Sequence, residues 1–109
     1  MIQINAIIRR EKVSDVINAL EEEKYYAFSK WEISGRGKQK GIQIGDFLYE
    51  EMPKEMLYMI VDNEEEKNQV IDVIMQNALS GESGNAGDGK IFVTPVTESY
   101  TISSQEKDN

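Results

Sequence analysis

A strand–helix–strand pattern that occurs twice is the feature of this sequence that most restricts its fold. In the first unit, residues 2–9 are rich in β-branched side chains and predict a strand. Residues 12–24 then predict a helix, because Val13, Val16, Ile17 and Leu20 recur at the spacing of one helix face. Residues 27–35 alternate between apolar and charged side chains, a pattern typical of a half-buried strand.

The second unit repeats this order. The short apolar run at 56–61 predicts a buried strand, and Asn63 has the character of a helix N-cap with Glu66 three residues later. That helix is expected to end near Leu79, and a last strand is expected over 90–96, with Pro95 indicating an edge or a strand end. Two such units of similar length predict an α+β fold, a ferredoxin-like βαββαβ sandwich.

In this fold two helices cover one face of the sheet, and the other face is bare in a monomer. Trp31 and several aliphatic side chains are expected on the bare face. An apolar face of this kind usually mediates self-association, so we expect an oligomer.

Composition excludes several classes of site. The chain of 109 residues, expected to form a single domain, contains neither Cys nor His, which excludes a zinc or iron–sulfur site and a Ser-His-Asp or Cys-His active site. Its net charge of -8 argues against nonspecific binding to nucleic acid. No apolar run is long enough to span a membrane, so we expect a soluble, cytoplasmic protein.

Two glycine-rich segments are the candidate functional elements. Residues 36–54 form an unusually long connection between two predicted strands, and residues 80–89 precede the last strand. Each by itself is compatible with a solvated loop, but together they combine glycine backbone amides with lysines, as anion-binding sites do. Neither matches a Walker GxxxxGK[ST] motif or a Rossmann GxGxxG motif that opens a helix. The residues alone therefore predict an anion or nucleotide site between two loops.

Three motifs carry a resemblance to a known family. They are "GRGKQKG" after the second strand, "MPK" at the end of the long connection, and "GDGKIFV" at the start of the last strand. Over nearly its whole length the chain resembles the nitrogen-regulatory PII signal-transduction proteins. The segment "GKQKGIQIGDFLYEEMPK" is most similar to the subgroup associated with nitrogenase gene clusters.

The resemblance implies a trimer with ATP or ADP bound in clefts between subunits. It implies that Mg²⁺ and 2-oxoglutarate bind beside ATP, with Gln39 coordinating the metal and Lys54 pairing with a 2-oxoglutarate carboxylate. The implied nucleotide-binding residues are Ser29, Gly35, Arg36, Gly37, Lys38, Gln39, Gly87, Asp88, Gly89 and Lys90, and those for 2-oxoglutarate are Gln39, Lys40, Gly41 and Lys54.

The chain departs from the family pattern in its polar tail, residues 99–109, which we expect to be frayed. Two arginines that grip phosphates in the family are replaced by Thr101 and Ser103. The loss of charge-assisted contacts of this kind costs roughly 1.5–3 kcal/mol each.

Three functions are compatible with these features. The first is a non-enzymatic sensor of ATP/ADP and 2-oxoglutarate that acts through residues 36–54 on a target enzyme, with nitrogenase as the candidate target, as a homotrimer or with a homologous subunit. The second is a divergent adaptor that has lost nucleotide control and binds another anion or only a protein. The third, an enzyme, is disfavoured because the chain has no histidine and no paired carboxylates on one face.

Overall fold

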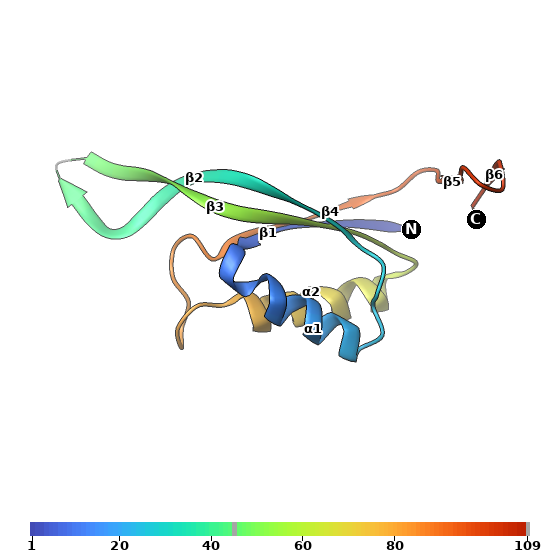
Figure 1. Cartoon of the computed structure of the whole chain (residues 1–109), viewed down its shortest axis with the longest axis horizontal. Helices are drawn as coiled ribbons and strands as arrows, with labels where there is room; N and C mark the ends of the chain where they lie inside the picture. Colours follow the sequence, from blue (N-terminus) through green and yellow to red (C-terminus); the bar gives the residue numbers. More distant parts are fainter. Residues whose placement is uncertain (45, 109) are drawn as a thin grey trace.

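A sheet lies over two helices in the computed structural model of the chain (Figure 1). The structure describes the backbone of residues 1–44 and 46–108 and the side chains of residues 1–36 and 52–108. The elements are β1 (Ile2–Arg9), the 3₁₀ helix η1 (Arg10–Lys12), α1 (Val13–Glu22), β2 (Ser29–Ile44), β3 (Asp46–Val61), α2 (Glu64–Ala78), β4 (Gly89–Pro95), β5 (Tyr100–Thr101) and β6 (Glu106–Lys107).

The main sheet has the order β2-β3-β1-β4, and every neighbouring pair in it is antiparallel. This order, together with the two strand–helix–strand units, is the ferredoxin-like βαββαβ fold predicted from the sequence. Pro95 is the last residue of β4, which is an edge strand. The sequence predicted an edge or a strand end for Pro95, because proline has no backbone N–H to donate, and this prediction is confirmed.

The core lies between the sheet and the helices. Alternate residues of β1, Ile4, Ala6 and Ile8, are buried against the helices. The helices contribute the buried Val16, Leu20, Val70 and Ile74, which recur at helical spacing as predicted. Burial of these apolar side chains is the main force that fixes the helices on this face.

The start of α2 follows the predicted capping pattern. The Asn63 side chain accepts a hydrogen bond from the Glu66 backbone N–H at 2.9 Å, which confirms Asn63 as the N-cap. The Glu66 carboxylate in turn accepts from the Asp62 backbone N–H at 2.9 Å. Each contact satisfies a backbone donor at the beginning of the helix.

The connection between the second and third strands continues the sheet. Residues 36–44 belong to β2 and residues 46–54 belong to β3, so the long loop expected between the two strands is part of a long hairpin. It is paired over residues 36–38 and 49–51 and again over residues 43–44 and 46–47. The register shifts between Lys38 and Gln43. In Figure 1 this hairpin reaches well beyond the body of the molecule, which leaves it accessible to a partner.

The face of the sheet away from the helices is bare, as expected. The register places Trp31, Met56 and Ile7 in one row across this face, and Tyr58, Asn5 and Phe92 in the next. Trp31, Ile60 and Phe92 are exposed. This apolar face is the surface expected to mediate self-association.

The tail differs from its prediction. Residues 99–108 form a small hairpin of β5 and β6, which extends from the body at the end opposite the β2–β3 hairpin (Figure 1). The expectation of a frayed tail is wrong for these residues, because Asp108 accepts hydrogen bonds from the hydroxyls of Ser99 and Thr101 at 2.6 and 2.8 Å.

Candidate anion-binding site

A hollow of about 360 Å³ brings the two glycine-rich segments together on the bare face of the sheet. It is lined by Ile7, Gly35, Arg36, Met52, Lys54, Gly87, Gly89, Lys90 and Phe92. Residues in or next to the first segment thus lie around the same hollow as Gly87, Gly89 and Lys90, although the two sets are distant in sequence. Three of the lining residues, Arg36, Lys54 and Lys90, are cationic, and a hollow of this charge suits an anion.

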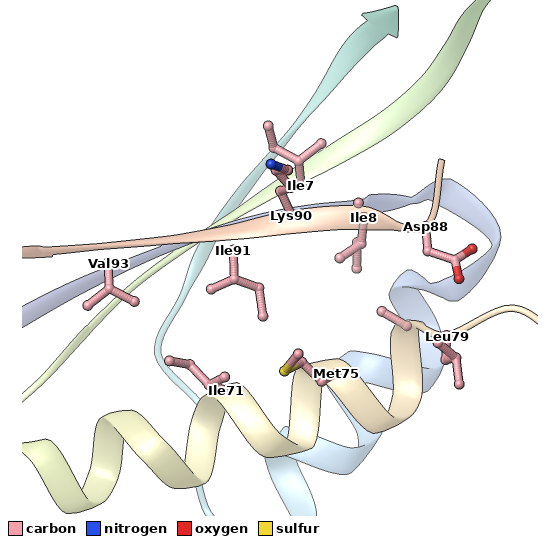
Figure 2. A pocket seen from close by; sticks show the side chains of 11 residues that line it. Ile7, Ile8, Ile71, Met75, Leu79, Asp88, Lys90, Ile91 and Val93 are labelled. Atoms are coloured by element: carbon pink, nitrogen blue, oxygen red, sulfur yellow. The ribbon is translucent and has the colours of Figure 1, made fainter. Parts of the chain in front are cut away.

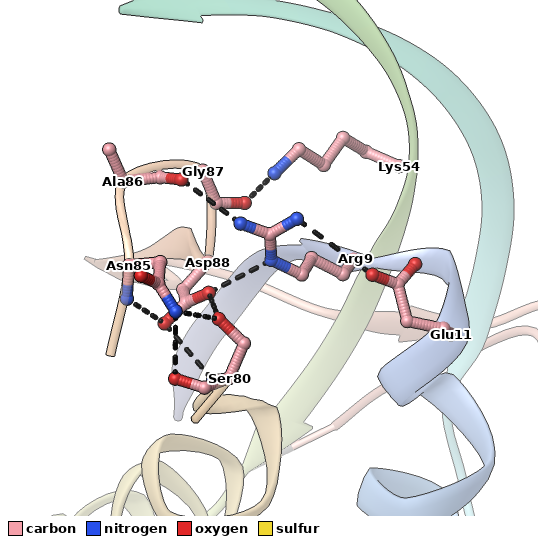
Figure 3. Close-up of polar contacts among 8 residues, drawn as sticks. All are labelled: Arg9, Glu11, Lys54, Ser80, Asn85, Ala86, Gly87 and Asp88. Carbon is pink, nitrogen blue, oxygen red and sulfur yellow. Dashed lines mark hydrogen bonds and ion pairs between the residues drawn. The ribbon is translucent and has the colours of Figure 1, made fainter. Parts of the chain in front are cut away.

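Lys54 links the two segments directly. Its side chain lies on β3 and its Nζ donates a hydrogen bond to the Gly87 carbonyl oxygen (Figure 3). The residue is only 6% exposed, which is unusual for a lysine. Burial lowers the pKa of Lys54, and so does the charge of Arg9, while Asp88 and Glu11 act in the opposite direction. A dehydrated ammonium group of this kind gains strongly from an anionic partner.

Asp88 organises the 80–89 loop. Its carboxylate accepts hydrogen bonds from the Ser80 hydroxyl, from the Ser80 N–H at 3.1 Å and from the Asn85 N–H at 2.9 Å. Burial on its own raises the pKa of this carboxyl, but the hydrogen bonds from Ser80, Asn85 and Arg9 together lower the pKa far below its usual range. Asp88 is therefore a fixed anion that holds the loop closed.

Arg9 is a member of this network that the sequence analysis missed. Its Nε donates to Asp88 Oδ1 at 2.8 Å and its Nη2 donates to the Ala86 carbonyl at 3.0 Å (Figure 3). Arg9 pairs with Lys54 in the β1–β3 register, which places both cations beside the loop. Its partner is 79 residues away in sequence, so no local motif signals the contact.

Gly89 allows the loop to approach the sheet closely. Its φ of +121° is a conformation that other residues rarely adopt, and a Cβ at this position would overlap the Ile7 carbonyl oxygen. Glycine is therefore required here both for the turn and for the packing of β4 on β1.

The predicted site residues fall into three groups. Gly35, Arg36, Lys54, Gly87, Gly89 and Lys90 line the hollow. Ser29 begins β2 and Asp88 faces the helix side, and neither lines it. The side chains of Lys38, Gln39 and Lys40, and the surroundings of Gly37 and Gly41, lie outside the described residues, so the roles implied for these five positions remain predictions.

A second hollow, of about 430 Å³, lies between α2 and β4 (Figure 2). It is lined mainly by apolar side chains, among them Ile71, Met75 and Ile91. The Asp88 carboxylate at its end is already satisfied by the network of the loop. This hollow is larger but offers an anion little, so the cationic hollow is the better candidate.

The described part of the chain lacks two further kinds of feature. No helix there is long and apolar enough to cross a membrane. Among the same residues, no group of three or more acidic side chains is arranged to hold a metal ion.

Comparison with known proteins identifies the family. The model of the family described as "Nitrogen regulatory protein P-II" matches residues 1–106. The chain belongs to the P-II family. Members of this family are non-enzymatic signal transducers, which confirms the expectation that the chain is not an enzyme.

Several relatives carry names that refer to nitrogen fixation. The chain is 44% identical to "Nitrogen fixation nifHD region GlnB-like protein 1" of Methanothermococcus thermolithotrophicus, over 97% of each chain. It is 49% identical to "Nitrogen fixation nifHD1 region GlnB-like protein 1" of Methanosarcina barkeri, over 94% of this chain and 93% of the relative. It is 38% identical to "Nitrogen regulatory protein P-II 1" of Methanothermobacter thermautotrophicus, over 97% and 92%. The resemblance to the nitrogenase-associated subgroup is thereby confirmed.

Proposed function

We propose that this P-II protein binds ATP or ADP in the cationic hollow, together with Mg²⁺ and 2-oxoglutarate, and that it controls a target protein through residues 36–54. The observation that carries the proposal is that Gly35, Arg36 and Lys54 lie around one hollow with Gly87, Gly89 and Lys90. These are the positions that the family resemblance assigns to nucleotide and 2-oxoglutarate.

The donor set of the hollow fits these ligands. Arg36 and Lys90 offer charge-assisted hydrogen bonds to phosphates, and the buried Lys54 offers the same to a carboxylate. A triphosphate beside a dicarboxylate concentrates negative charge, which Mg²⁺ offsets when it is bound. Gln39 is the residue expected to coordinate that ion.

The bare face of the sheet supports a trimer as part of the proposal. A monomer would leave Trp31, Ile60 and Phe92 in water. Phe92 also lines the hollow, so a neighbouring subunit on this face would lie next to the bound nucleotide. A homotrimer and a mixed trimer with a homologous subunit would both cover the face.

Nitrogenase is the candidate target. The names of two relatives that cover nearly the whole chain place those proteins in nitrogen fixation regions. The β2–β3 hairpin projects from the body and is accessible to a large partner (Figure 1).

Isothermal titration calorimetry tests the proposal. ATP should bind in the presence of Mg²⁺, and 2-oxoglutarate should tighten that binding. The variant Lys54→Gln should lower the affinity for 2-oxoglutarate by about tenfold or more, because it removes the charged partner of a carboxylate. Lys67→Gln on α2, which removes the same charge far from the hollow, is the matched control. A wild-type protein that binds neither nucleotide nor 2-oxoglutarate would refute the proposal.

One observation favours the divergent adaptor as a second candidate. The Thr101 hydroxyl, at a position where the family has an arginine, donates to Asp108 within the tail at 2.8 Å. The tail thus uses this position for its own hairpin. Tight ATP binding in the same titration excludes the adaptor, and binding of a protein target without any nucleotide response supports it.

A further inference from the structure

We propose that Arg9 is a positioning residue for the hollow. It holds the 80–89 loop in its binding conformation by donating hydrogen bonds to both Asp88 and the Ala86 carbonyl. This inference rests on the proposed function, because it concerns the binding of the same nucleotide. Arg9 does not line the hollow, so its action on a ligand passes through the loop.

The two hydrogen bonds from Arg9 lie on either side of Gly87, the loop residue between them that lines the hollow. Arg9 Nε holds Asp88 at 2.8 Å and Nη2 holds the Ala86 carbonyl at 3.0 Å, one contact on each side of Gly87. The third nitrogen, Nη1, is 3.8 Å from the exposed carboxylate of Glu11 and adds little. Since the Arg9 and Asp88 side chains are only 13% and 17% exposed, their ion pair is partly shielded from water.

Through Asp88, Arg9 is also connected to the other end of the loop. Its carboxylate also accepts from Ser80 and from the Asn85 N–H, so the loop closes on one carboxylate that is attached to β1 through Arg9. Lys54 holds the Gly87 carbonyl from the opposite strand, and a ligand carboxylate would compete for this lysine. When the Lys54 ammonium group turns to a ligand, Arg9 still holds the loop to β1 through Asp88 and the Ala86 carbonyl.

A simpler explanation is that Arg9 contributes only positive charge to an anion site. The two explanations predict opposite effects at Asp88. Neutralisation of a carboxylate near an anionic ligand tightens binding if only charge matters. It weakens binding if Asp88 must hold the loop for Arg9. The variant Asp88→Asn therefore separates the two explanations.

The experiment is an ATP titration, in the presence of Mg²⁺, of the wild-type chain and five variants. We expect Arg9→Gln and Asp88→Asn each to weaken ATP binding by about tenfold, because the loop must then be ordered by the ligand. The double variant should be no weaker than the single ones by more than about twofold, because both residues act through one contact. Arg10→Gln is the control, because it removes the same charge from the neighbouring residue, whose ion pair with Glu32 is exposed. Its ATP affinity should stay within about twofold of wild type.

Arg9→Lys keeps the charge and guards against an unfolded Arg9→Gln. Lysine has no planar fork, so it cannot hold Asp88 and the Ala86 carbonyl in the same way. We expect this variant to lose at least about threefold in ATP affinity. In the ligand-free protein, faster amide exchange of residues 86–89 than in wild type should accompany the loss.

Three outcomes would overturn the inference. One is an Asp88→Asn variant that binds ATP more tightly than wild type. Another is a folded Arg9→Gln or Arg9→Lys variant with wild-type affinity, a result that leaves the proposed function intact. The last is a wild-type protein that does not bind ATP, which overturns the proposed function as well.

Discussion

The 80–89 loop and the tail, residues 99–108, are built in the same way but attached differently. Each is a polar segment closed on one aspartate. Asp88 accepts from Ser80 and from the Asn85 N–H, and Asp108 accepts from the hydroxyls of Ser99 and Thr101. At Asp88 burial is the largest single influence and raises the pKa, but the hydrogen bonds together lower it by more. At Asp108 the hydrogen bonds from Ser99 and Thr101 lower the pKa, and burial opposes them.

The difference lies in the partners from outside the segment. Asp88 is bound by Arg9 of β1, 79 residues away, whereas Asp108 is bound by Ser99 and Thr101, 9 and 7 residues away. Local hydrogen bonds are sufficient to shape a turn. A contact from the sheet is needed to place that turn relative to a second segment, and only the 80–89 loop forms part of the hollow.

The largest expected effect concerns Gly89, where the loop joins the sheet. Gly89→Ala should destabilise the protein by at least about 3 kcal/mol, because the substitution strains the backbone and brings a Cβ into the Ile7 carbonyl. Gly81→Ala is the control, since Gly81 also has a positive φ, of +67°, but has space for a Cβ. It should cost about 1–2 kcal/mol. Denaturant unfolding measures both, and equal losses would contradict the close packing of Gly89.

The next effect compares the two aspartates and depends on pH. At pH 7, Asp88→Asn should cost about 2 kcal/mol, because Asp88 is mostly buried and holds Arg9. Asp108→Asn should cost clearly less, because both hydroxyl donors to Asp108 lie within the tail and the hydrogen bond from Thr101 is exposed to solvent. The pKa of Asp88 is lower in the folded protein than in the unfolded chain, so its contribution is fully present above the unfolded pKa of about 3.9. That contribution is lost as the pH falls from there through the folded pKa.

Unfolding curves at a series of pH values test this expectation. The stability difference between wild type and Asp88→Asn should shrink as the pH falls below about 4. A difference that stays constant over this range, or that equals the difference for Asp108→Asn at pH 7, would show that attachment to β1 does not matter.

The smallest effect is expected for removal of the tail. A chain that ends after Glu98 should keep its free energy of unfolding within about 0.5 kcal/mol, because within the described residues β5 and β6 pair only with each other. Thermal unfolding at several protein concentrations measures this. A large loss of stability, or a change in oligomeric state, would mean that the tail packs on a second copy of the chain.

Periodic patterns in the sequence determined the elements of the fold. Val13, Val16 and Leu20 predicted a buried helix face because a helix repeats every 3.6 residues, and Asn63 with Glu66 predicted the start of α2 because both contacts are local. The sequence predicted the long connection over 36–54 but not its strand pairing, and it did not predict the hairpin of the tail. Their strands depend on cross-strand pairing, which neither local propensity nor glycine content shows.

The sequence by itself also determined the family and, through its motifs, most of the residues that line the hollow. It did not reveal the contact between Arg9 and Asp88. The resemblance assigned Asp88 to nucleotide binding, which stays a prediction, and the structure shows that its carboxylate is bound by Arg9. Only the tertiary structure decided these contacts, because the pairing of β1 with β3 and β4 brings residues 9, 54 and 87–89 together. Hydrogen bonds and ion pairs act over a few ångströms of space, and separation along the chain does not indicate that distance.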